Sequence, residues 1–362
     1  MKTEGTRSHV MFKMPLLRKR RDTFGLDVGS SAIKTLQLSQ NGGGFRLAAL
    51  GIAPLPPDVI VEGTIREPAV VTEAIQEAVS RAGVSTKDAA IALSGRELII
   101  KKIQIPTVPA KELHDAMQLE AEHHIPFAID EVYLDYHVVG KPEETMDLIL
   151  VAVKKSKVTE YVSVVEAAGL NPVVVDVDGF ALGNQFELNQ PEERGEAVAL
   201  VDIGASAMKT NVVRDGASIF ARDIPFGGKN YTQAIAQHLR ISVEQAEAAK
   251  LGKDVGIPWD SIVAALEAVS RELSLEIQRT FDYFASTAES ERIGKIVLAG
   301  GCAQLPGLID YLSSTWGIRV EVARPFDHIH VGAAHADMVA TAGPGLAVAV
   351  GLGLRRAGDK DQ

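Results

Sequence analysis

A chain of 362 residues exceeds what one ordinary hydrophobic core supports, so two or more domains are expected. Hydrophobic residues make up 46% and charged residues 23%, as in folded soluble proteins, and the net charge of −10 argues against a broad nucleic-acid-binding surface. A single cysteine, Cys302, excludes an intramolecular disulfide framework and fits a reducing compartment.

The first 22 residues form a basic leader. Its second half, MFKMPLLRKRRD, carries a dense cluster of positive charge: Lys13, Arg18, Lys19, Arg20 and Arg21. No secretory signal is expected, because the cluster follows Leu16 and Leu17 instead of preceding a longer apolar stretch. The most apolar run of the chain, 343–354, is shorter than the roughly 18 residues that a membrane span needs. We expect a disordered leader, with contact to anionic lipid as the alternative.

The segment after the leader predicts a strand that folds back on itself. Residues 24–38 (FGLDVGSSAIKTLQL) are apolar and β-branched, the glycines of 41–44 make a turn, and 45–52 return as a second strand. A helix is expected over 69–83, ended by Gly83, and 88–95 predict a buried strand.

The pattern changes between Leu98 and Asp178. The expected elements, in order, are a strand (98–105), a helix (110–124), two strands (132–139 and 148–153), a helix (156–168) and a strand (172–178). We interpret this segment as a small α+β subdomain inserted between two halves of a larger fold.

The second half of the chain begins again with a pair of strands over 197–224. A glycine turn then leads into a helix, and Ser242 with Gln245 predicts a capping box for the next one. A long amphipathic helix over 261–289 precedes a buried strand with a glycine pair, Gly300 and Gly301.

The strand pairs that open the two halves repeat each other. ALVDIGASAMKTNVV, residues 199–213, matches residues 24–38 without gaps, so that Asp27 corresponds to Asp202 and Lys34 to Lys209. A strand ending in Asp-x-Gly-x-Ser directs backbone N–H groups and hydroxyls into a concavity that holds phosphate oxygens, and its aspartate can meet a hydrated Mg²⁺. One copy would be an ordinary turn; two copies predict duplicated halves that hold phosphates between them.

These hairpins, followed by VLAGG (297–301), resemble the ATPase superfamily of actin, heat-shock chaperones and sugar kinases. The segments VVDVDGFAL, EAEHHIPF, ALSGRELIIKKIQIP and VEQAEAAKLG narrow the resemblance to the PilM family of type IV pilus assembly, over about residues 22–354. The resemblance implies an α/β, actin-like ATPase fold in which two duplicated ribonuclease-H-like domains flank a nucleotide cleft. The expected division is 23–97 with 179–198 and 341–362 (first subdomain), 98–178 (inserted subdomain) and 199–340 (second domain).

The resemblance also implies ATP with Mg²⁺ as cofactors. Asp27 and Asp202 would meet Mg²⁺ through waters, and the phosphate-binding residues would be Gly29, Ser30, Ser31, Lys34, Gly204, Ala205 and Ser206. Ala205 replaces the hydroxyl of Ser30, a loss of about 1 kcal/mol that binding should survive. The adenosine contacts would be Glu247, Lys250, Gly300, Gly301 and Gly228, with Gly227 beside the sugar.

Asp178 occupies the place where the superfamily positions the hydrolytic water. An aspartate at a helix start is also a good cap, and no further base is evident, so at most a slow ATPase is expected. Cys302 is expected to be a small buried residue, and His123 and His124 lack the further ligands of a metal site.

The function implied is that of a cytoplasmic, ATP-binding adaptor at the inner face of the inner membrane. It would dock the amino-terminal peptide of the membrane protein PilN between the inserted subdomain and the first one, with Ile103, Ile105 and the 110–124 helix as candidate contacts. Pilus motor ATPases and self-association are further expectations, and nucleic acid is not. The alternatives are an FtsA-like or actin-like filament protein, a secretion-system relative and a small-molecule kinase.

Overall fold

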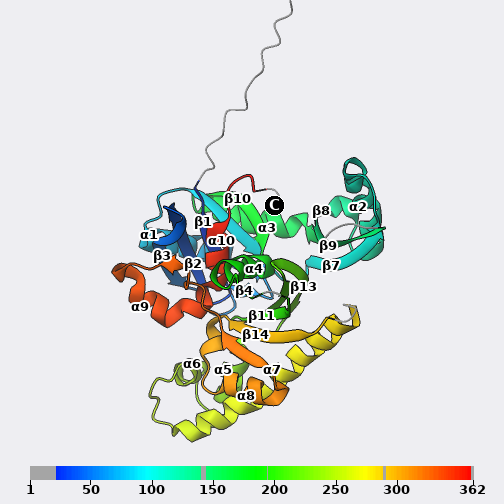
Figure 1. Cartoon of the computed structure of the whole chain (residues 1–362). Coiled ribbons are helices and arrows are strands. Elements are labelled where there is room, and N and C mark those ends of the chain that lie inside the picture. Colours follow the sequence, from blue (N-terminus) through cyan, green and yellow to red (C-terminus); the bar gives the residue numbers. More distant parts are fainter. Residues whose placement is uncertain (1–21, 140–143, 194, 288–290, 360–362) are drawn as a thin grey trace, which may run out of the picture.

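The computed structural model describes residues 22–139, 144–193, 195–287 and 291–359. The basic leader therefore lies outside the described residues, apart from Asp22. Two mixed sheets organise the described chain, and a smaller three-stranded sheet stands to one side of them (Figure 1).

The first sheet has the strand order β10-β6-β1-β2-β3-β16. Its bounds are β1 (Phe24–Val28), β2 (Ala32–Asn41), β3 (Gly44–Pro54), β6 (Asp88–Leu93), β10 (Asn171–Val177) and β16 (Ile329–His330). The first three strands are antiparallel, while β6 and β10 continue parallel to β1. Helices α1 (Pro68–Ala82) and α3 (Lys155–Ala167) bury their apolar sides with this sheet in one core, beside the short hairpin of β4 (Ile60–Val61) and β5 (Thr64–Ile65).

The second sheet repeats that arrangement with the order β13-β12-β11-β14-β15. Its bounds are β11 (Ala197–Ile203), β12 (Met208–Arg214), β13 (Ala217–Ile224), β14 (Ile293–Ala299) and β15 (Arg319–Val322). Here too three antiparallel strands are followed by two parallel ones. The expected duplication of the two halves is confirmed.

One core joins the second sheet to four helices. They are α5 (Gly228–Leu239), α6 (Val243–Lys250), α7 (Trp259–Thr287) and α8 (Leu308–Trp316). The predicted capping box of α6 is confirmed: the Gln245 N–H donates to the Ser242 hydroxyl, and the Ser242 N–H donates to the Gln245 side chain, both at 3.2 Å.

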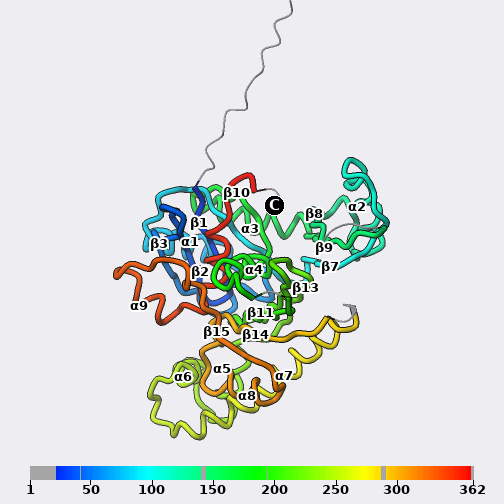
Figure 2. Tube along the Cα trace, in the orientation of Figure 1, coloured from blue at the N-terminus to red at the C-terminus, as the bar shows by residue number. Residues whose placement is uncertain are grey.

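Helices α4 (Asp178–Asn189) and α10 (Ala347–Leu354) connect the two halves (Figure 2). Helix α10 packs on the first sheet, α4 packs on the second, and the two helices pack against each other. A Cβ on Gly351 would lie 1.7 Å from the Ala181 carbonyl oxygen, so only glycine permits this approach.

A 22-residue stretch, Ala333–Leu354, is long and apolar enough to span a membrane by length and composition alone. It comprises α9 (Ala333–Ala342), a 3₁₀ turn (Gly343–Leu346) and α10. Residues 347–353 are buried inside the protein, as is usual for a core helix.

The inserted subdomain is smaller than expected. Its sheet has the order β7-β9-β8, with β7 (Leu98–Pro106), β8 (Val132–Val139) and β9 (Thr145–Lys154), and α2 (Ala110–His124) covers one face. The expected range 98–178 is corrected, because β10 pairs with β6 and α3 buries its apolar side in the first core. The second domain also ends before 340, because β16 pairs with β3.

Candidate functional site

The two hairpins have the same register. Asp27 lies opposite Lys34 in the β1–β2 pair, and Asp202 lies opposite Lys209 in the β11–β12 pair. In the second hairpin the Gly204 N–H donates to the Ala207 carbonyl at 2.9 Å, which closes the turn around Ala205 and Ser206. The corresponding turn of the first hairpin holds Gly29, Ser30 and Ser31.

The charged ends of the two hairpins meet in one cluster. Lys34 Nζ lies 2.9 Å from Asp27 Oδ2, whereas Lys209 Nζ lies 2.7 Å from Asp178 Oδ2 and 3.6 Å from Asp202 Oδ2. All three carboxylates are buried. The Asp202 carboxyl is also close enough to Lys34 and Asp27 for both to influence its protonation. The charged ends of the two hairpins therefore lie in the same part of the molecule.

Burial and neighbouring charges shift the pKa of two members of this cluster, Asp202 and Lys209. Burial raises the pKa of Asp202, an effect that Lys209 and Lys34 oppose and that Asp27 and Asp178 reinforce. For Lys209, burial works against the charged form, but Asp178, Asp202 and Asp27 hold its pKa well above the ordinary value. Lys209 therefore remains a cation at neutral pH.

Asp178 is the first residue of α4 and follows β10 directly. Asp178 does not act as a helix cap, because Val177 occupies the N-cap position of α4 and no side-chain hydrogen bond caps this helix. The Asp178 carboxylate is instead directed at Lys209, a residue of the other half of the fold. This contact places the predicted water-positioning residue in the same charge cluster as Asp202.

The expected adenosine residues gather where α5 and α6 meet. Lys250 Nζ donates to Glu247 at 2.7 Å, to the Thr232 hydroxyl at 2.9 Å and to the Gly228 carbonyl at 3.3 Å. The Gly228 N–H donates to the Gly204 carbonyl at 2.9 Å, so this group adjoins the second hairpin. Lys250 is buried, while the Glu247 side chain is 46% exposed and can still meet a ligand.

The glycine pair after β14 borders the same place. Gly300 has a φ of 84°, and a Cβ there would lie 2.3 Å from the Ile203 carbonyl oxygen and 2.6 Å from Asp202 Oδ1. Only glycine fits this turn. At Gly301 nothing lies within 4 Å of the position that a Cβ would take, which leaves space beside the backbone. Gly227 precedes Gly228 at the N-cap of α5.

These residues fit a nucleotide with its cation. The Ser206 hydroxyl is buried and has no hydrogen-bond partner among the described residues, so a phosphate oxygen would satisfy it. Backbone turns and two lysines supply further positive potential for phosphates. Within the described part of the chain, no group of three His, Cys, Asp or Glu residues could ligate a metal directly. Carboxylates such as those of Asp27 and Asp202 are among the oxygen groups that a hydrated Mg²⁺ accepts.

Sequence reasoning missed Asp223. It lies on β13 opposite Lys209, and its Oδ2 accepts the Gly95 N–H at 2.7 Å, which ties the second sheet to the loop that precedes β7. Burial raises the pKa of this carboxyl to about 6, an effect that Gly95 and Lys209 oppose. The sequence does mark Asp223, because an aspartate interrupts the strand SIFARDI just before the glycine turn. Its partner Gly95 is far away in the sequence, so the contact itself could not be predicted.

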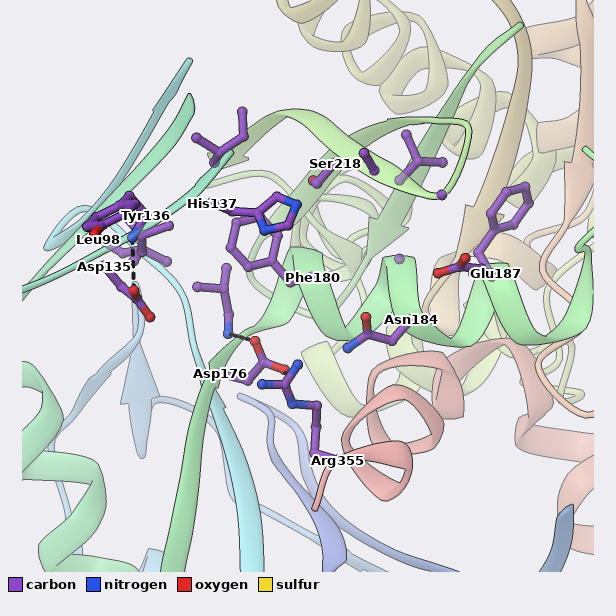
Figure 3. A pocket seen from close by; sticks show the side chains of 18 of the residues that line it. Leu98, Asp135, Tyr136, His137, Asp176, Phe180, Asn184, Glu187, Ser218 and Arg355 are labelled. Carbon is purple, nitrogen blue, oxygen red and sulfur yellow. Dashed lines mark hydrogen bonds and ion pairs between the residues drawn. The ribbon is translucent and has the colours of Figure 1, made fainter. Parts of the chain in front are cut away.

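A cavity of about 650 Å³ lies between the inserted subdomain and the rest of the fold. Its walls come from β8, β9, β10, α4, the turn between β12 and β13, and Arg355 (Figure 3). Ile103 and Ile105, the guessed contacts, do not line it. Their side chains are buried in the core of the inserted subdomain together with Leu113 and Met117 of α2.

Duplicated sheets with facing Asp-x-Gly hairpins define an actin-like ATPase fold. A family model described as "Type IV pilus assembly protein PilM" matches residues 25–357. The chain belongs to this family. The solved PilM–PilN type IV pilus biogenesis complex is similar, with a TM-score of 0.83, 31% identity, and coverage of 93% of this chain and 98% of that one.

More distant relatives share the fold. The cell division protein FtsA of Streptococcus pneumoniae is 25% identical over 347 residues, which cover 83% of this chain and 75% of FtsA. MreB5 of Spiroplasma citri, solved with AMPPNP, matches with a TM-score of 0.51 and 11% identity, covering 91% of this chain and 94% of that one. The expected actin-like fold and family are confirmed.

Proposed function

We propose that this protein is an ATP-binding adaptor of type IV pilus assembly that docks the cytoplasmic amino-terminal peptide of PilN at the inner face of the inner membrane. Family membership supports the assembly role, and the similar solved complex contains PilN. The observation that carries the nucleotide part is the single charge cluster that Asp27, Asp202 and their lysines form from two duplicated hairpins.

In this proposal ATP lies between the hairpins. The backbone of Gly29–Ser31 and of Gly204–Ser206 surrounds its phosphates, while Lys34 and Lys209 oppose their charge. Mg²⁺, when bound, neutralises phosphate oxygens, and Asp27 and Asp202 hold its waters. Glu247 meets the ribose.

Asp178 would orient water toward the terminal phosphate once Lys209 turns to the phosphates instead. Because that lysine is bound to Asp178 at 2.7 Å, hydrolysis requires the ion pair to open first. This requirement supports a slow ATPase.

The cavity beside the inserted subdomain is the proposed peptide site. It combines apolar walls, such as Phe180 and Val175, with polar side chains. Asn184 Nδ2 has no hydrogen-bond partner among the described residues and can donate one, while Asp176 Oδ2 lies 3.5 Å from Arg355 Nε (Figure 3). An extended peptide offers N–H and C=O groups to such atoms and apolar side chains to such walls.

Calorimetric titration of ATP–Mg²⁺ tests the nucleotide assignment. Wild type should bind, and Asp27→Ala should bind at least tenfold more weakly, because it loses the water-mediated cation contact. Asp282→Ala, an exposed aspartate of α7, is the matched control and should bind like wild type. Equal binding by wild type and Asp27→Ala would refute the metal assignment.

A second titration tests the adaptor role. A synthetic peptide of the PilN cytoplasmic amino terminus should bind with different affinities to ATP-loaded and nucleotide-free protein, because a ligand shifts a conformational equilibrium only through its differential affinity for the states. Identical affinities would refute the coupling between nucleotide binding and peptide binding. Absence of peptide binding under both conditions would refute the proposed peptide site.

A further inference from the structure

The described chain starts beside the cavity. The Thr23 hydroxyl donates to the backbone carbonyl of Arg355, and the Arg355 side chain lines the cavity wall with its Nε 3.5 Å from Asp176 Oδ2. The leader, residues 1–22, is therefore attached close to the cavity. An extended chain spans about 3.3 Å per residue, so the segment from Met11 to Arg21 can reach any part of it.

The cavity is short of positive charge. Its lining includes the guanidinium of Arg355 and five carboxylates: Asp135, Asp176, Glu187, Glu193 and Asp215. Glu193 is paired with Lys295 at 2.6 Å, and Asp215 lies 3.6 Å from Arg214. The Asp135 side chain lies on the β8 wall, and Asp176, on β10, is paired with Arg355 itself (Figure 3). A cationic occupant is electrostatically favoured here.

The sequence of the leader matches this lining. Residues 11–17 (MFKMPLL) are mostly apolar, and residues 18–21 (RKRR) are all basic. Asn184 Nδ2, which has no hydrogen-bond partner among the described residues, can donate to a backbone carbonyl of such a segment.

We propose that residues 11–21 of this chain occupy the cavity as an intramolecular competitor of the docking peptide. The competition with the PilN peptide rests on the proposed peptide site, whereas the docking of residues 11–21 in the cavity does not. A tethered segment acts at an effective concentration of about 1 mM, so a segment with an intrinsic Kd of about 0.1 mM would weaken a competing peptide roughly tenfold.

Disulfide trapping in the full-length chain tests the docking. Leu17→Cys is combined either with Val175→Cys, an exposed position of the cavity wall, or with Lys87→Cys, an exposed control position that does not line the cavity. The control is within equal reach, because Ala89, two residues after Lys87, is the strand partner of Phe24. The native Cys302 is buried and does not compete.

The disulfide between positions 17 and 175 should form at least tenfold faster than the one between positions 17 and 87, as measured by non-reducing electrophoresis and peptide mass spectrometry. Reversing the charges of residues 18–21 to glutamate should remove the difference. Equal rates in the unreversed chain would overturn the proposal. Equal rates, together with binding of the chain to phosphatidylglycerol vesicles, would overturn the proposal and show that the basic leader binds a lipid surface instead.

Peptide affinity separates this proposal from the proposed function. The charge-reversed full-length chain should bind the PilN peptide about tenfold more tightly than wild type, and unchanged affinity would overturn the competition. If the peptide binds neither chain, the proposed peptide site fails, whereas the cross-linking rates still decide whether the leader occupies the cavity.

Discussion

Replacing Asp223 with asparagine tests how burial controls charge near the cleft. The ordinary pKa of an aspartate is 3.8, and burial raises that of Asp223 to about 6. Because the pKa of Asp223 is higher in the folded state than in the unfolded state, folding favours the protonated carboxyl. The folded protein therefore loses stability as pH rises from about 4 to about 6. Two pKa units correspond to about 3 kcal/mol. This is an upper bound, because Asp223 keeps partial solvent exposure.

Asparagine keeps an oxygen that accepts the Gly95 N–H but carries no charge. Urea unfolding of wild type and Asp223→Asn should therefore give nearly equal free energies at pH 4, while at pH 7.5 the variant should be more stable by up to about 3 kcal/mol. Other titrating groups act in both proteins and cancel in the difference. Asp223→Ala, which also loses the hydrogen bond to Gly95, should be less stable than Asp223→Asn at every pH by about 1–3 kcal/mol. A difference between wild type and Asp223→Asn that does not change with pH would refute this reasoning.

Three further substitutions address the cleft and the core. Asp178→Asn should lower ATP turnover at least tenfold in a phosphate-release assay without weakening ATP binding, because Lys209 is then free to meet the phosphates; equal turnover would exclude a water-positioning role. Lys250→Met removes charge-assisted hydrogen bonds and should weaken ATP and ADP about tenfold but leave inorganic triphosphate binding unchanged, since its contacts lie on the adenosine side. Gly351→Ala forces a methyl group into the α4 backbone and should cost at least about 3 kcal/mol in thermal unfolding. Gly44→Ala, where a Cβ meets nothing within 4 Å, is its control and should be neutral.

Local patterns predicted the elements well. The bounds of α2 agree with the expected 110–124, and the gapless repeat gave the correct register of both hairpins, because the strands of a hairpin are neighbours in sequence. The order of Asp27 and Lys34 along the chain already places them opposite each other once the turn length is known. The same holds for Asp202 and Lys209.

The sequence alone does not determine which strands and residues that are far apart along the chain become neighbours in the fold. Nothing in the sequence of β10 states that its neighbour is β6, about 80 residues earlier in the chain, so proximity in sequence favours the inserted subdomain instead. Ile103 and Ile105 alternate correctly along β7, but alternation does not indicate which face meets α2 and which meets the cavity. The role of Asp223 likewise depends on Gly95, a residue of the other half of the fold.

The two hairpins have the same register, but their lysines pair with different carboxylates. Because of this difference, the two hairpins form one joint site and not two separate ones. Lys34 is bound to the aspartate of its own hairpin, whereas Lys209 reaches across to Asp178, which directly follows β10 of the first sheet. A perfectly symmetric pair would leave Asp178 as an uncompensated buried charge, which is costly. Because Lys209 compensates Asp178 and Asp202 together, the two halves are joined electrostatically at the place where phosphates are proposed to bind. A ligand that draws Lys209 away must therefore change the contact between the halves, which gives the cleft a physical means of altering the rest of the fold.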